Sequence, residues 1–199
     1  MAISTQSSDE SSIKTDFPSL MNHFLVAMPG LEDPFFKQTV SYIIQHDEQG
    51  AMGVMLNQPM PIQTSELLEQ LGFNPNQGIP QQDVLSGGPV QIQRGFVLHR
   101  PHGEWESSMP INKNVAITTS LDILEAIAND QGPEEYQLLL GYAGWDAGQL
   151  DQEMLDNSWL TVPANEELLF ETAVDERWHK ASELIGIDIN RLTNNAGHG

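Results

Sequence analysis

The sequence predicts a single α+β domain, and three observations carry that prediction. The chain has 199 residues, which suits one large domain. Short apolar runs bounded by turn residues fill the first part of the chain, as expected for strands. Helical patterns enter later and are mixed with further strands. This order is typical of α+β proteins and not of a doubly wound parallel sheet.

The first half of the chain predicts an antiparallel meander. Strands are expected at residues 24–28, 40–45 and 52–56, and a hairpin-type loop at 46–50 joins the last two. Thr64 or Ser65 is expected to cap a short helix that ends at Gly72. A short strand at 84–85 leads into the turn-forming sequence Ser-Gly-Gly-Pro-Val, and another strand is expected at 95–99.

The second half predicts a βαβ-like unit. It consists of a strand at 114–118, a helix capped by Ser120 and a strand at 138–140, and such crossovers are nearly always right-handed. A last short strand is expected at 159–162. Two helices are expected to bury one face each, the first through Leu121, Leu124, Ile127 and Ala128, and the last through Trp178, Ala181, Leu184 and Ile185.

The most demanding stretch runs from residue 136 to residue 159. Its unbroken leucines predict a strand buried on both faces. Gly141 and Gly144 then predict a corner, after which Asp146 is expected to cap a helix that buries Leu150, Met154 and Leu155. Trp145 has two interpretations. It either fills the core, as large aromatic side chains beside glycine usually do, or lines a cleft together with Asp146.

Composition and charge exclude several classes of function. The chain holds 28 Asp and Glu residues against 8 Lys and Arg, a net charge of −20, and no basic cluster. This argues against direct contact with nucleic acid or with anionic membranes. Cysteine is absent, which excludes disulfides and thiolate catalysis and fits a cytoplasmic protein. Neither a secretory signal nor a membrane-spanning segment is expected.

No motif in the sequence points to a catalytic residue, a cofactor or a metal. Nucleotide-binding patterns, HExxH and G-x-S-x-G are all missing, and the six histidines are dispersed. Two tails are expected to be disordered or loose, at 1–15 and at 193–199, and the domain is expected to span 16–192.

A ligand site is nevertheless predicted where glycines meet polar or aromatic residues at strand ends, because backbone approaches a ligand closely there and side chains converge. In the competing interpretation these residues serve the fold, with Trp145 in the core and His99 bonded to a carbonyl group. The residues expected to share one wall of the site are Gly87, Gly88, His99, Gly144, Trp145 and Asp146.

Three segments together resemble the AlgH/YqgE family. They are HFLVAMPGLEDPFFKQTVSYIIQHDEQGAMGVMLNQP, LSGGPVQIQRGFVLH and LLLGYAGWDAGQLDQEMLDNSWLTV, within a match that covers about residues 17–188. The resemblance implies one domain whose mainly antiparallel mixed sheet bends into a pseudo-barrel with helices packed outside. It implies no catalytic residues, and the family's usual label, transcriptional regulator, reflects a genetic association with alginate control.

Composition and resemblance together lead to one functional hypothesis and one alternative. The hypothesis is a non-enzymatic cytosolic binding or regulatory protein that acts through an unknown protein partner or small ligand and not by direct DNA contact. The alternative is a small-molecule enzyme with a site near His99 and Trp145.

Overall fold

The computed structural model describes residues 18–186, so both predicted tails lie outside the described residues. It contains ten strands, four α-helices, one π-helical turn and one 3-10 turn within that range. The strands are β1 (His23–Ala27), β2 (Val40–Asp47), β3 (Gly50–Met55), β4 (Pro59–Gln63), β5 (Asp83–Ser86), β6 (Val90–Arg100), β7 (Ser108–Pro110), β8 (Ala116–Thr118), β9 (Glu135–Asp146) and β10 (Trp159–Pro163). The helical elements are α1 (Thr64–Gln70), α2 (Leu121–Ala128), α3 (Gln149–Leu155), η1 (Glu167–Glu171), η2 (Val174–Glu176) and α4 (Arg177–Leu184).

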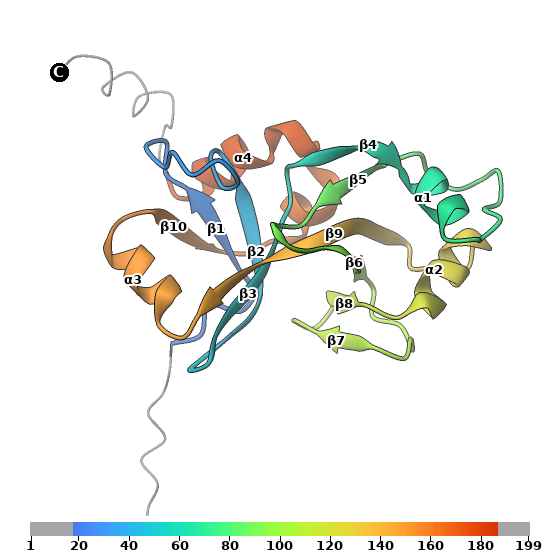
Figure 1. Cartoon of the computed structure of the whole chain (residues 1–199), viewed down its shortest axis with the longest axis horizontal. Helices are drawn as coiled ribbons and strands as arrows, with labels where there is room; N and C mark the ends of the chain where they lie inside the picture. Colours follow the sequence, from blue (N-terminus) through green and yellow to red (C-terminus); the bar gives the residue numbers. More distant parts are fainter. Residues whose placement is uncertain (1–17, 187–199) are drawn as a thin grey trace, which may run out of the picture.

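The strands form one mainly antiparallel sheet that curls into a half-barrel, with the helices around it (Figure 1). The order of the main path is β10-β1-β2-β3-β9-β6-β8-β7, and β5 joins β9 from the side and pairs with β4. Only the β5–β9 pair is parallel among the described strands. The α+β fold and the antiparallel meander of β1, β2 and β3 are thereby confirmed.

Strand β9 is the central element of the sheet. Its first half pairs with β6 on one side and with β5 on the other, and its second half pairs with β3. Because β6 lies antiparallel to both β8 and β9, the latter two strands run parallel, as the predicted βαβ-like unit requires. The long strand therefore joins both ends of the sheet.

Three clusters of buried side chains surround the sheet. The first lies against α4 and η1 and contains Phe24, Tyr42 and Trp178. The second lies under α1 and α2, which pack together at one end of the molecule, and the third holds Trp145 and Trp159 beside α3 at the other end (Figure 1). None of the described helices is long and apolar enough to cross a membrane.

The structure corrects five local predictions. Strand β9 continues through Asp146, so the expected corner is part of a strand, and Gly148 occupies the N-cap position of α3. Leu121 and Leu155 were expected on buried helix faces but are 63% and 76% exposed. Leu184, the last residue of α4, is likewise half exposed, although Ala181 in the same turn is buried.

Candidate functional site

An apolar groove of about 340 Å³ lies between α1, α2 and the sheet. Helix α2 begins after Ser120, whose extended backbone conformation suits an N-cap, and turns Leu121 and Leu124 toward the groove. Helix α1 contributes Leu67 and Leu71 from the opposite side. Leucines of β9 form the floor, and residues of β6 and β8 complete the lining.

An irregularity in β6 builds the remaining wall. Val90 pairs with Tyr142 and the next pair is Gly95 with Leu140, so residues 91–94 of β6 lie opposite the single residue Gly141. Such a bulge bends the strand and frees its side chains from the ladder. The extra residues project Ile92, Gln93 and Arg94 into the groove lining.

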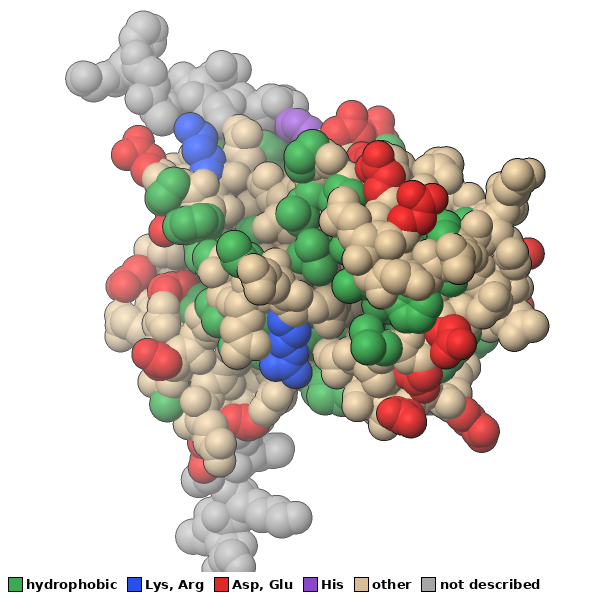
Figure 2. Space-filling model, turned by 45° about the vertical axis from the view of Figure 1, so that its right-hand side comes forward, with side chains coloured by type: hydrophobic (Ala, Val, Ile, Leu, Met, Phe, Trp, Pro, Cys, Tyr) green, Lys and Arg blue, Asp and Glu red, His purple; other side chains and the backbone are tan. Residues whose placement is uncertain are grey.

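Several large apolar side chains of the groove lining are exposed. Six large hydrophobic side chains are exposed in the described residues, and three of them, Leu71, Ile92 and Leu121, line this groove. Figure 2 shows hydrophobic side chains gathered in the middle of one face, beside a basic side chain and with acidic side chains around them. Contiguous exposed apolar surface of this kind marks interaction sites in soluble proteins.

Arg94 is the one charged residue in the groove lining. Its guanidinium lies over the Phe96 ring, 5.2 Å from the ring centroid, and its Nη1 is 3.5 Å from the Gln91 side-chain oxygen. No Asp or Glu oxygen of the described residues comes within ion-pair distance of it. Among the described Lys and Arg side chains only Arg100 and Lys180 form ion pairs with carboxylates, so Arg94 keeps its charge without an acidic partner.

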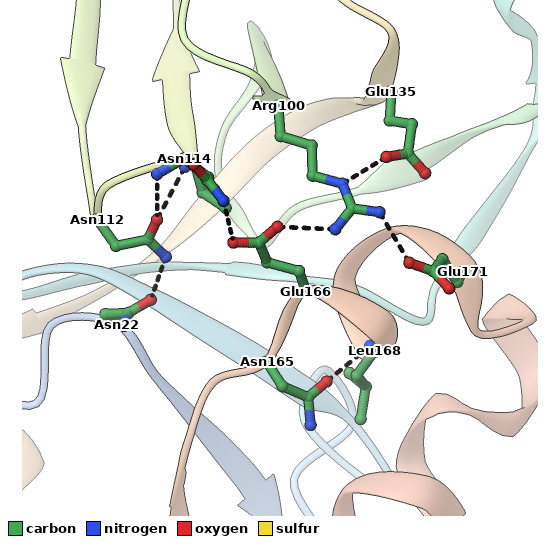
Figure 3. A network of polar contacts seen from close by, with 10 residues as sticks. Asn22, Arg100, Asn112, Asn114, Glu135, Asn165, Glu166, Leu168 and Glu171 are labelled. Atoms are coloured by element: carbon green, nitrogen blue, oxygen red, sulfur yellow. Dashed lines mark hydrogen bonds and ion pairs between the residues drawn. The ribbon is translucent and has the colours of Figure 1, made fainter.

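Arg100, at the end of the same strand, shows the contrasting arrangement. It bonds Glu135, Glu166 at 2.7 Å and Glu171 at 2.8 Å, so three carboxylates surround one cation (Figure 3). The bond from Arg100 lowers the pKa of the Glu166 carboxyl. Because this arginine is already neutralised and ties η1 to β6 and β9, we assign it to the fold.

His99 is fully buried at the end of β6 and makes two hydrogen bonds. The Pro101 carbonyl oxygen lies 3.1 Å from Nδ1 and can only accept, so Nδ1 carries the hydrogen. Nε2 then accepts from the Thr118 hydroxyl at 2.8 Å, and that hydroxyl in turn accepts from Ser108. Burial lowers the pKa of the His99 imidazole, which favours this neutral tautomer.

Trp145 is buried at the far end of β9. Its indole N–H and that of Trp159 both donate to one Glu153 oxygen, at 2.9 and 2.8 Å. The two indole rings and Phe36 contact one another, with centroids 5.5 to 6.1 Å apart. This arrangement holds α3 against the sheet.

The structure brings some of the six predicted site residues together and separates others. Gly87 and Gly88 pack against the backbone of Gly141 and Tyr142, close to the segment 144–146. A hollow of about 450 Å³ is lined by Gly144, Trp145 and Asp146 with residues of β2 and β3.

His99 lies on the neighbouring strand, β6, opposite the first residues of β9. It pairs with Tyr136, whereas Trp145 pairs with Ala51, and nine residues of extended β9 between the two positions correspond to about 30 Å. The structure therefore does not place His99 and Trp145 in a shared wall.

The groove itself was missed by sequence reasoning. Residues 91–94 carry no strand pattern, so the only signal was an isoleucine and an arginine in a polar run. For a metal, the described residues offer no group of three or more His, Cys, Asp or Glu side chains.

Fold and groove define a class: a small α+β protein with a curled sheet and an apolar surface groove. Comparison with known proteins gives the family. The profile of a family described as AlgH-like matches residues 24–190, and the chain belongs to that family. This agrees with the resemblance found in the sequence.

Relatives of known sequence match nearly the whole chain. A UPF0301 protein of Thioalkalivibrio sulfidiphilus is 50% identical over 177 residues, which cover 89% of this chain and 95% of that protein. Another, of Saccharophagus degradans, is 49% identical and covers 92% and 90%. The solution structure of the AlgH protein from Pseudomonas aeruginosa, 42% identical, matches with a TM-score of 0.73 over 98% of this chain and 100% of that one.

Proposed function

We propose that this chain is a non-enzymatic cytosolic binding or regulatory protein that acts through a small ligand or a protein partner. The observation that carries the proposal is the groove between α1, α2 and the sheet. Ligand sites are concave and mostly apolar, with few polar groups, and occupy about 300–1,000 Å³. The volume and lining of the groove fit that description at its lower end.

The chemistry of the lining supports binding rather than catalysis. The Thr and Ser hydroxyls, the Gln93 amide and Arg94 are its polar side chains, and no lining side chain is a carboxylate or an imidazole. His99 reaches the groove only through Thr118, and both of its nitrogens are engaged. The alternative, an enzyme with a site near His99 and Trp145, has less support, because about 30 Å of strand separates their positions.

Charge supports a function without direct contact with nucleic acid. Phosphate contacts need clustered Lys and Arg side chains, and the net charge of −20 repels phosphate at low salt. We therefore expect no salt-sensitive binding to duplex DNA. Fluorescence anisotropy of a labelled duplex at low ionic strength tests this, and micromolar or tighter affinity would contradict it.

The groove is tested with Nile red, a neutral dye whose emission rises in apolar sites. We expect the native chain to enhance its emission and Leu121→Asp to bind it at least about fivefold more weakly, because Leu121 is an exposed wall of the groove. Aspartate in the first turn of α2 suits the helix dipole, so the variant should fold.

Leu155→Asp is the matched control, since Leu155 is an exposed leucine on α3 outside the groove lining. It should bind the dye as the native chain does. No emission change with the native chain, or equal loss in both variants, would refute a binding groove at this place.

A further inference from the structure

We propose that the groove binds an amphipathic anion, namely a medium-length acyl chain that ends in a carboxylate held by Arg94. This inference rests on the proposed function, since it names the ligand class of the same groove. Its two halves come from different observations. The apolar lining of the groove indicates that the body of the ligand is a hydrocarbon chain, and the charge of Arg94 at the bulge of β6 indicates an anionic head group.

The apolar half follows from the lining. Most of the groove offers only hydrocarbon contacts, which come from leucines of α1, α2 and β9 and from apolar side chains of β6. A volume of about 340 Å³ lies at the small end of ligand sites, which suits one flexible chain and not a two-chain lipid.

The anionic half follows from Arg94. Its guanidinium carries five donors, and the described residues supply only one weak bond at 3.5 Å, to Gln91. Arg100, six residues further on, has three carboxylates around it, so acidic partners are readily placed on this sheet where the fold needs them. The guanidinium therefore remains available to bind a carboxylate in a bidentate manner.

Local charge also favours an anion in spite of the net charge. The groove lining contains Arg94 and no acidic residue, a local charge of +1 on a chain of −20. At physiological ionic strength the Debye length is about 8 Å, so distant carboxylates are screened while a contacting arginine is not. A neutral chain of equal length would gain the same apolar contacts but not this ion pair.

The test compares three ten-carbon probes: decanoate, decanol and decylammonium. We titrate each into the native chain by isothermal calorimetry and follow backbone amide shifts by NMR. We expect decanoate to bind up to about fivefold more tightly than decanol, the upper end for an exposed ion pair, and decylammonium to bind most weakly. The largest shifts should fall on residues 92–96 and on Leu121 and Leu124, which line the groove.

Three variants locate the head group. Arg94→Gln should abolish the preference for decanoate over decanol, and Arg94→Lys should restore part of it because the charge returns. Lys113→Gln removes an exposed cation outside the groove lining and should leave the preference unchanged. Retained preference in Arg94→Gln would overturn the assignment of the head group.

The outcomes separate this inference from the proposed function. Equal binding of all three probes at the groove keeps the binding function and refutes an anionic ligand. No binding of any probe, together with no Nile red response, refutes both. A preference for a leucine-rich peptide over decanoate, or dimerisation that Leu121→Asp abolishes, would replace the acyl anion by a protein occupant.

Discussion

The sharpest prediction concerns the contribution of the His99 side chain to the stability of the fold. Its imidazole has no exposed surface, donates to the Pro101 carbonyl and accepts from the Thr118 hydroxyl. One face of the environment is the Trp105 ring, 4.9 Å away between centroids and nearly perpendicular. Replacing His99 by Ala removes both hydrogen bonds and leaves a cavity beneath Trp105.

The size of the effect follows from these contacts. Two neutral hydrogen bonds contribute about 1 kcal/mol each, and truncation of a buried ring adds on the order of 2 kcal/mol for lost packing. We expect His99→Ala to lower the free energy of unfolding by about 3–5 kcal/mol. For a chain of this size that corresponds to a fall of roughly 8–15 °C in melting temperature.

Denaturant unfolding and calorimetry measure this loss. His179→Ala is the matched control, because His179 is exposed on α4, and it should change stability by no more than about 0.5 kcal/mol. If His99→Ala cost less than about 1 kcal/mol but abolished a ligand effect, His99 would belong to a functional site and our assignment to the fold would be refuted.

The pH dependence of stability gives a second measurement at His99. Burial lowers the pKa of the folded imidazole below the value of about 6.5 expected for the unfolded chain. Between the two values the unfolded state binds more protons, so the free energy of unfolding falls as the pH decreases through 6.5. The slope is at most about 1.4 kcal/mol per pH unit. From pH 7.5 to 5.5 the native chain should therefore lose more stability than His99→Gln, and parallel curves would contradict this.

Three further predictions concern the rest of the fold. Arg177 is buried, which lowers its pKa to about 10, and its guanidinium donates to the carbonyl groups of Leu56 and Thr172. Arg177→Ala should therefore lower the free energy of unfolding, measured with denaturant, by about 2–4 kcal/mol. Glu153→Ala should make the indole N–H groups that it binds exchange faster with deuterium by NMR, whereas the other two tryptophans should not respond. Gly88→Ala should lower the free energy of unfolding by at least about 3 kcal/mol, because φ is +152° and a Cβ would overlap the Tyr142 backbone. Gly95→Ala is the control, since a Cβ at Gly95 meets open space, and thermal unfolding should show no such loss.

Local sequence patterns were sufficient to predict an element where a single local signal, such as a turn or a helix cap, determines it. The run at 40–45, the turn after it and the run at 52–56 predict a hairpin, and β2 and β3 form that hairpin. Ser120 occupies the N-cap position of α2 as expected, with extended backbone. The mainly antiparallel α+β fold followed from such signals because neighbouring strands in a meander also pair in space.

Prediction failed where glycine served a tertiary contact. The sequence Gly-Tyr-Ala-Gly predicts a corner, because glycine usually permits a turn. Here Gly141, with φ of +75°, lets β9 pass close to the backbone of Gly88 and Val90 while the strand continues to Asp146. Strand β4 was also not predicted from the sequence. It contains two prolines, which suit an edge strand but give no strand pattern.

The groove could not be predicted from the sequence, because each segment that lines it has a local pattern that indicates an ordinary helix, strand or loop. Leu121 is the first residue of an amphipathic helix and was expected to be buried, and residues 91–94 resemble a polar loop. Only the register of β6 against β9 brings Arg94 to the same surface as the exposed leucine. The average charge of the chain points away from anions, whereas the local charge of this one apolar surface favours them. Because a small ligand experiences the local charge at contact distance, the groove should decide which small ligand this protein binds, whereas the net charge still opposes nucleic acid.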